Sequence, residues 1–255
     1  MLETLKSAVR RIAPGALRPH RYFASLARKK TGRRVISGPF EGMRYIDHSI
    51  GSAYIPKLLG IYERELHQIV EAIVGASPSL IVDVGAAEGY YAVGLARRIP
   101  GACVVAFEMS PDGRDALAEM ASLNRVTGQV SVLGACETPE ELSGILAGKG
   151  PAVVIMDVEG YENALLDPTK IPELEACTIL LELHEFAVPG ITDTIRRRFE
   201  DTHELELIWA EDRSSVDFPW RTPISRLLPG RYTANAASEW RPPGMAWYFM
   251  RPLRS

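Results

Sequence analysis

Two spacings of hydrophobic positions alternate along most of the chain. Short aliphatic runs typical of buried strands are separated by segments in which apolar residues recur every three or four positions, as on one face of a helix. The expected strands are Leu80–Val84, Cys103–Glu108, Val130–Leu133, Ala152–Asp157, Thr178–Leu183, Glu204–Ala210 and Met245–Met250. The expected helices are Tyr62–Val74, Tyr90–Arg98, Pro111–Asn124, Pro139–Leu146, Glu162–Leu166 and Ile191–Asp201. This order predicts an α/β fold: a mostly parallel, seven-stranded sheet flanked by helices, with a C-terminal antiparallel strand.

Composition is consistent with one catalytic domain. The chain has 255 residues, of which 46% are apolar, enough for a sizeable core. No apolar run reaches the roughly 20 residues of a membrane span, and the N-terminus lacks the apolar core of a secretory signal. We therefore expect a cytoplasmic protein. The sequence leaves open whether it forms a homo-oligomer.

Basic residues are concentrated at the N-terminus. Residues 1–34 contain ten Lys and Arg against one acid, Glu3, so this arm carries +9 and the remainder −12. Leu2, Leu5, Val9 and Ile12 recur there at helical spacing, which suits an anionic membrane surface or polyanion. An organelle transit peptide and a helix packed on the acidic domain are the alternatives. Nucleic acid is not an expected partner, because no recognition module is visible.

A glycine turn follows the first expected strand, in Ile81–Gly89. Such a turn is typical of nucleoside-cofactor sites at the carboxyl end of a parallel strand. Ala87 stands where a dinucleotide site requires a glycine, and Asp83 would repel a pyrophosphate but attract an ammonium group. The pattern favours S-adenosylmethionine over NAD. The expected cofactor-binding residues here are Asp83, Gly85, Ala86, Ala87, Glu88, Gly89 and Tyr90.

Two further strand ends extend this expected site. Glu108 lies 23 residues after Gly85, where a carboxylate can accept hydrogen bonds from a ribose diol. Met109 is expected at the edge of the adenine, and the small residues Ala135 and Cys136 are expected to lie against the base. NAD enzymes use an acid like Glu108 too, so this residue does not separate the two cofactors.

The fourth and fifth strands end in Asp157-Val-Glu159-Gly-Tyr-Glu162 and Glu182-Leu-His184. Together with the glycine turn, these motifs make the chain resemble the FkbM-type methyltransferases, a class I S-adenosylmethionine-dependent family. The resemblance covers roughly residues 36–186, although Ala87 replaces an asparagine often found in the family's turn. It implies a Rossmann-like methyltransferase fold and methylation of hydroxyl oxygens, mostly on sugars and polyketides.

Methyl transfer to a hydroxyl group requires alignment of the acceptor and removal of a proton. We expect His184 or Asp157 to be the base and Glu159 to position the substrate or cofactor; Asp157 also borders the cofactor. Asp157, Glu182 and His184 offer the ligand types of a divalent metal site, but no tight local motif supports a metal, so metal dependence is not favoured.

The remaining predictions concern domain organisation and rival functions. We expect a basic arm at 1–34 and a methyltransferase domain at 35–255, with its cofactor-binding core at 76–186. Residues 212–243 interleave aromatic residues with arginines and are expected to form a lid that selects the acceptor, a glycan or small molecule. An NAD-dependent oxidoreductase and a catalytically silent cofactor-binding module remain alternatives.

Overall fold

The computed structural model describes residues 19–253. The amphipathic pattern of Leu2–Ile12 therefore lies outside the described residues. The strands are β1 (Leu80–Val84), β2 (Cys103–Phe107), β3 (Val130–Leu133), β4 (Val153–Met156), β5 (Thr178–Leu183), β6 (His203–Trp209) and β7 (Ala246–Pro252). The helices and 3-10 turns of this part are α2 (Pro19–Thr31), α3 (Tyr54–Leu59), η2 (Arg64–Leu66), α4 (His67–Ala76), α5 (Tyr90–Arg98), α6 (Pro111–Leu123), α7 (Pro139–Leu146), α8 (Glu162–Leu165), η3 (Pro172–Ala176), α9 (Ile191–Phe199), α10 (Pro223–Leu227) and α11 (Arg231–Ala237).

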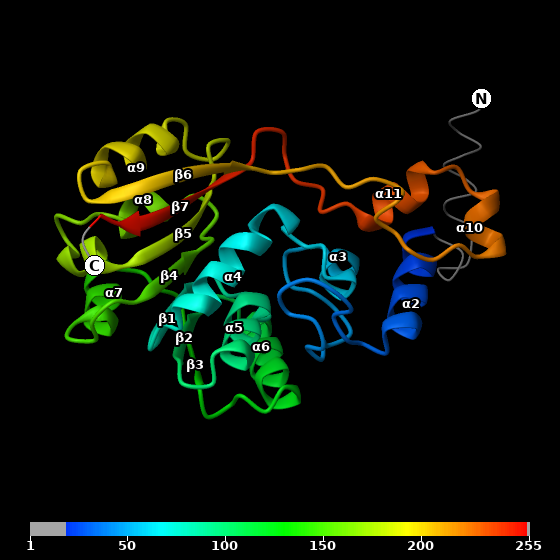
Figure 1. Cartoon of the computed structure of the whole chain (residues 1–255), viewed down its shortest axis with the longest axis horizontal. Helices are drawn as coiled ribbons and strands as arrows, with labels where there is room; N and C mark the ends of the chain where they lie inside the picture. The colour runs from blue at the N-terminus through cyan, green and yellow to red at the C-terminus, as the bar shows by residue number, and fades with distance from the viewer. Residues whose placement is uncertain (1–18, 254–255) are drawn as a thin grey trace. The chain divides into compact units, whose positions relative to one another are not determined.

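The strands form one seven-stranded sheet in the order β3-β2-β1-β4-β5-β7-β6 (Figure 1). Strands β1 to β5 pair in parallel, whereas β7 lies between β5 and β6 and is antiparallel to both. The predicted α/β fold is confirmed: the sheet is seven-stranded and mostly parallel, with an antiparallel C-terminal strand. The carboxyl ends of β1, β2, β4 and β5 consequently meet at one edge of the sheet.

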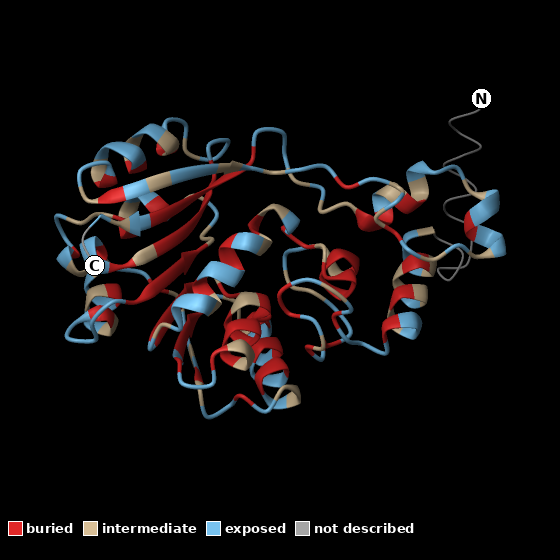
Figure 2. Cartoon of the chain, viewed as in Figure 1, coloured by how far each residue is buried: buried red, intermediate tan, exposed pale blue. Residues whose placement is uncertain are grey.

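All residues of the central strands β1 and β4 are buried (Figure 2). Alternate residues of a strand face opposite sides. Leu80, Val82 and Val84 of β1 therefore join a core that also contains buried residues of α7, α8 and α9. Ile81 and Asp83 face the other side, where α5 packs on β1. Burial of each large aliphatic side chain contributes about 1.5–3 kcal/mol, which fixes the strand register and positions the strand ends.

Local departures from the expected boundaries have physical causes. The expected helix Tyr62–Val74 is instead a 3-10 turn, η2, followed by α4, and it does not begin at Tyr62 because Glu63 adopts a left-handed conformation with φ +48°. Strands β2 and β4 end one residue early, at Phe107 and Met156, so that the acids following them lie in the edge turns. The short helices α3, α10 and α11 were not expected, since none is long enough to show a clear apolar period.

The chain divides into two compact units. The first contains, within the described part, residues 19–48, 52–62 and 212–240; the second contains residues 49–51, 63–211 and 241–253 and includes the whole sheet. In the first unit α2 packs against α3 and α11, and the rings of Phe23 and Phe218 meet edge to face at 5.0 Å. Within the described residues, no helix combines the length and apolar character needed to cross a bilayer.

Candidate active site

The glycine turn after β1 is shaped by close contact with the end of β4. Gly85 has φ +88°, and a Cβ atom placed on it would lie 1.7 Å from the carbonyl oxygen of Asp157. The Asp157 N–H donates to the Val84 carbonyl at 2.9 Å, which joins the two strand ends. Only glycine permits this approach. The turn and Asp157 are therefore held together by the backbone itself.

Glu108 links the same turn to the end of β2. Its Oε2 accepts from the Ala87 N–H at 2.8 Å, and its Oε1 accepts from the Ser110 N–H at 2.7 Å. The carboxylate is 7% exposed, and a Cβ on Gly113 would crowd it at 2.7 Å from Cγ. The residue predicted to bind ribose thus also supports the turn. Each carboxylate oxygen retains a further lone pair that a ribose hydroxyl can use.

Asp83 is buried beneath the turn. Burial raises the pKa of Asp83 to about 7, although a hydrogen bond from the Ala92 N–H in α5 acts in the opposite direction. Its Oδ2 is buried and has no hydrogen-bond partner among the described residues. A buried carboxylate oxygen of this kind is costly unless it meets a donor. A ligand with an ammonium group would satisfy it.

The other expected cofactor residues lie around the turn. Glu88 is fully buried, and its Oε2 accepts from the Ile50 N–H at 2.9 Å, so it anchors the short segment 49–51 in this unit. Met109 is 78% exposed at the end of β2. Burial raises the pKa of the Cys136 thiol to about 11, which keeps it neutral. The remaining members are the buried Ala86 and Tyr90, the strained Ala87 at φ +48°, the left-handed Gly89 and the half-buried Ala135.

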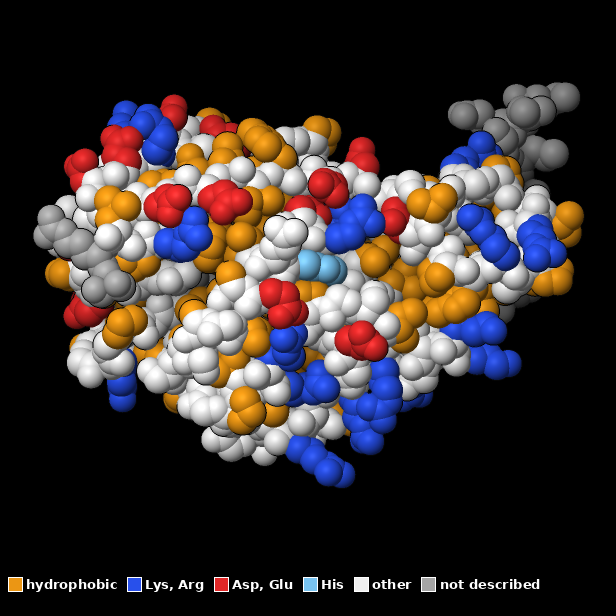
Figure 3. Space-filling view, viewed as in Figure 1, with side chains coloured by type: hydrophobic (Ala, Val, Ile, Leu, Met, Phe, Trp, Pro, Cys, Tyr) orange, Lys and Arg blue, Asp and Glu red, His pale blue; other side chains and the backbone are white. Residues whose placement is uncertain are grey.

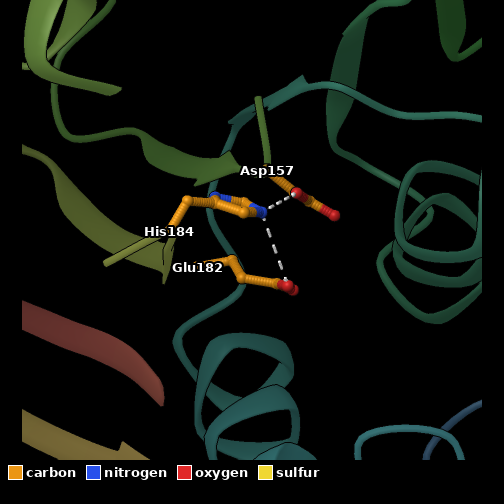
Figure 4. Close-up of side chains that lie close together, drawn as sticks. All are labelled: Asp157, Glu182 and His184. Atoms are coloured by element: carbon orange, nitrogen blue, oxygen red, sulfur yellow. Dashed lines mark ion pairs between the residues drawn. The ribbon is translucent and has the colours of Figure 1, made fainter. Parts of the chain in front are cut away.

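His184 lies at the centre of the candidate catalytic cluster (Figure 4). Its side chain is 1% exposed, and its Nδ1 pairs with Oε1 of the fully buried Glu162 at 2.5 Å. Its Nε2 faces Asp157 Oδ1 at 3.4 Å and Glu182 Oε1 at 3.7 Å, the two contacts drawn in Figure 4, and Glu159 Oε2 at 3.4 Å. The ring is therefore surrounded by carboxylates at both nitrogens.

These carboxylates determine the charge of the ring. Burial acts to lower the pKa of His184, but the hydrogen bond to Glu162 and the negative charges of Asp157, Glu162 and Glu182 raise it to about 9. Burial raises the pKa of Asp157 to about 6, against the positive charge of His184. Near pH 7 the pair therefore favours an imidazolium beside an ionised Asp157.

Arg241, which precedes β7 in the chain, binds two carboxylates next to this cluster. Its Nη1 donates to Glu182 Oε1 at 2.6 Å, and its Nη2 donates to Glu63. Trp247 Nε1 donates to Glu182 Oε2 at 3.2 Å, and Tyr91 donates its hydroxyl proton to Glu63. Burial and the charge of Asp157 raise the pKa of Glu182 to about 8 despite Arg241. Both oxygens of Glu182 are thus held in place by donors.

A metal site is geometrically feasible at the same place. Asp157, Glu182 and His184 each offer one ligand atom, and these atoms lie within 4.8 Å of one another. Arg241 already donates to Glu182 Oε1, however, and Glu162 holds the ring by its other nitrogen. These three residues are the metal-ligand candidates named from the sequence. The sequence did not favour metal dependence, and the structure does not test it.

The sequence motifs indicated some members of this cluster but not all. Asp157, Glu182 and His184, expected from two different strand ends, are brought together, with Glu159 at 3.4 Å from the ring. Glu162 lies in the recognised motif, yet only its buried contact with His184 reveals its role. Glu63 lies within the segment covered by the family resemblance, but the sequence assigned it no role, because it precedes a short 3-10 turn and lies 119 residues before Glu182 in the chain.

Comparisons with known proteins give similarity only at the level of solved structures. No family model and no curated protein matches the chain, so membership of the FkbM-type family stays a prediction. A human methyltransferase 10 domain containing protein shares 11% identity over 93% of this chain and 96% of that chain, with a TM-score of 0.49.

Two bacterial enzymes give similar values. A precorrin-6y C5,15-methyltransferase from Geobacter metallireducens GS-15 shares 12% identity over 74% of this chain and 89% of its own, with a TM-score of 0.47. An O-methyltransferase from Bacillus cereus, solved in complex with SAH, shares 14% identity over 82% and 93%, with a TM-score of 0.44. The chain is thus similar to solved methyltransferases at low identity, and the arguments below rest on its own residues.

Proposed function

We propose that this protein is an S-adenosylmethionine-dependent methyltransferase that methylates a hydroxyl oxygen of a sugar, a glycan or another small metabolite. The observation that carries the proposal is the backbone contact between the glycine turn and Asp157. A nucleoside cofactor held over that turn would have its reactive end beside the His184 cluster. When bound, S-adenosylmethionine supplies a methyl group already activated on a positively charged sulfur.

The turn fits this cofactor better than a dinucleotide. Asp83 presents a buried carboxylate oxygen without a partner, which suits the ammonium group of the amino acid tail and opposes a pyrophosphate. Glu108 retains acceptor capacity for the ribose hydroxyls. Met109, exposed at the end of β2, offers an apolar side chain to the adenine. These features support the choice of S-adenosylmethionine.

Asp157 is the better of the two candidate bases. At neutral pH the raised pKa of His184 keeps its ring protonated, whereas most Asp157 carboxylate is ionised. Asp157 would accept the hydroxyl proton of the acceptor, and the cofactor, when bound over the turn, would supply the methyl group to the acceptor oxygen. The imidazolium of His184 holds Asp157 in place. Glu159, 79% exposed at its side chain, is available to bind the acceptor.

Binding and turnover measurements test the proposal separately. Isothermal titration should show binding of S-adenosylhomocysteine and none of NADH; the reverse result would contradict it. Asp157→Asn should retain S-adenosylhomocysteine affinity and lose about 10²- to 10⁴-fold in methyl transfer to a hydroxylated acceptor. Glu185→Gln is the matched control, because this nearby exposed acid bonds the start of α9 instead of His184. Equal turnover in both variants would remove Asp157 from the mechanism.

A further inference from the structure

Charge is distributed very unequally between the two units. The described residues of the first unit contain twelve Lys and Arg against five Asp and Glu, a net charge of +7. The residues assigned to the second unit contain 13 against 26, a net charge of −13. A basic unit attached to an acidic catalytic unit is suited to an anionic partner that the catalytic unit would repel.

The segment 218–238 of the first unit contains no acid and three arginines, Arg221, Arg226 and Arg231. All three are exposed, and none forms an ion pair with an acid within the described chain. Between them lie the exposed apolar side chains Ile224 and Leu227, at 52% and 86% exposure. Figure 3 shows basic and hydrophobic side chains intermixed in the region that contains α10.

Helix α10 is fixed so that these apolar side chains point outward. Thr222 caps the helix, with its Oγ1 accepting from the Ser225 N–H at 3.0 Å and the Ser225 hydroxyl accepting from the Thr222 N–H at 2.7 Å. The Tyr22 hydroxyl of α2 lies 2.7 Å from Thr222 Oγ1. Ser225 is 4% exposed, so the polar residue faces inward. Ile224 and Leu227, three positions apart, share the opposite face.

A helix with its apolar side chains in water and arginines beside them fits a membrane surface better than a nucleic acid. Exposed aliphatic side chains lose unfavourable contact with water when they enter the acyl boundary, while flanking arginines contact anionic headgroups. Nucleic acids would instead require aromatic platforms or polar groups directed at bases, which Ile224 and Leu227 do not provide. Farther along the unit, Val216 and Trp240 are 77% and 61% exposed.

We infer that the first unit docks the protein on an anionic lipid surface through α10, with Ile224 and Leu227 inserted at the acyl boundary and Arg221, Arg226 and Arg231 on the headgroups. The basic and apolar pattern of residues 1–34 agrees with the same partner. Helix α10 lies within the segment 212–243 that was predicted to form a lid, but the inference does not depend on methyl transfer, because docking requires neither cofactor nor acceptor.

Vesicle flotation of the full-length protein tests the inference. Vesicles of phosphatidylcholine with about one third phosphatidylglycerol should bind the protein, and pure phosphatidylcholine should not. The double variant Ile224→Ser with Leu227→Ser should bind at least about tenfold more weakly. Arg226→Gln should bind about fivefold more weakly. Leu253→Ser and Arg197→Gln, exposed residues of the second unit, are matched controls and should bind like the wild type.

Three outcomes would overturn the inference. The first is the absence of binding to anionic vesicles, and the second is wild-type binding by the double serine variant, which would indicate adsorption by charge alone. The third is a preference for single-stranded RNA or polyphosphate over vesicles at equal charge. An unchanged circular dichroism spectrum and thermal melt of the serine variant verify that it is folded.

Discussion

Replacement of Glu162 by glutamine tests the electrostatic basis of the catalytic cluster. Glu162 is fully buried and pairs with His184 Nδ1 at 2.5 Å, while its Oε1 also accepts from the Gly160 N–H at 3.1 Å. Glutamine retains an acceptor at this position but removes the charge. A hydrogen bond to a charged group contributes about 1.5–3 kcal/mol, and one pKa unit corresponds to about 1.4 kcal/mol. The pKa of His184 should therefore fall from about 9 by about 1–2 units.

The titration can be followed by NMR of histidine labelled in the ring, with His184 assigned from the His184→Gln spectrum. His203 is an internal control, since its Nε2 faces the Cys177 carbonyl at 2.9 Å and its pKa is lowered by burial. Glu159→Gln is the matched variant: this carboxylate also faces the ring, but it is 79% exposed, so water screens its charge and the shift should be smaller.

The same pairing has a consequence for stability. Because the pKa of His184 is raised above its unfolded value of about 6.5, the stabilisation by its charged form is complete below that pH and is lost as the pH rises through about 9. The ionisable groups that face the ring or its partners are those of Asp157, Glu159, Glu162, Glu182, Glu63 and Arg241. A pKa of His184 unchanged by Glu162→Gln, or lowered more by Glu159→Gln, would refute the reasoning.

Two further predictions concern the turn and the metal. Gly85→Ala should lower stability by about 3 kcal/mol or more and Tm by about 6–12 °C in a thermal melt, because its Cβ would lie 1.7 Å from the Asp157 carbonyl; Gly101→Ala, with no atom within 4 Å, should leave Tm unchanged. Dialysis against a chelator should leave methyl transfer unchanged, since Arg241 already pairs with Glu182. Activity lost on dialysis and restored by one divalent ion would establish a metal site.

The alternation of apolar spacings was sufficient to predict most of the sheet. Strands β1, β3 and β5 and helices α5 and α7 have the expected bounds, because their apolar residues are consecutive or regularly spaced and are flanked by clear turn residues. Helices α10 and α11 were not predicted, since segments of five and seven residues cannot display a helical period.

The candidate site was predictable where chemistry lies at strand ends and unpredictable where it comes from separate segments. Strand ends in a parallel sheet meet at one edge for any such fold, so Asp157 and His184 could be paired from sequence. Glu63 comes from the irregular segment before η2 and Arg241 from the one before β7, and only their contacts with Tyr91 and Glu182 show that they belong to the cluster.

The sequence by itself determined which segments are strands and which acids follow them. It also determined that the turn after β1 lacks the glycine that a pyrophosphate needs. Tertiary packing decided the protonation of the residues in the cluster and the exposure of the side chains on α10. Burial of Glu162 against His184 makes the ring a cation, and the approach of β4 makes Gly85 indispensable. The outward face of α10 could not be predicted either, because the sequence does not show that Ile224 and Leu227 are exposed. The local sequence pattern indicates the secondary structure of a segment, whereas the neighbours of each side chain are set by tertiary packing.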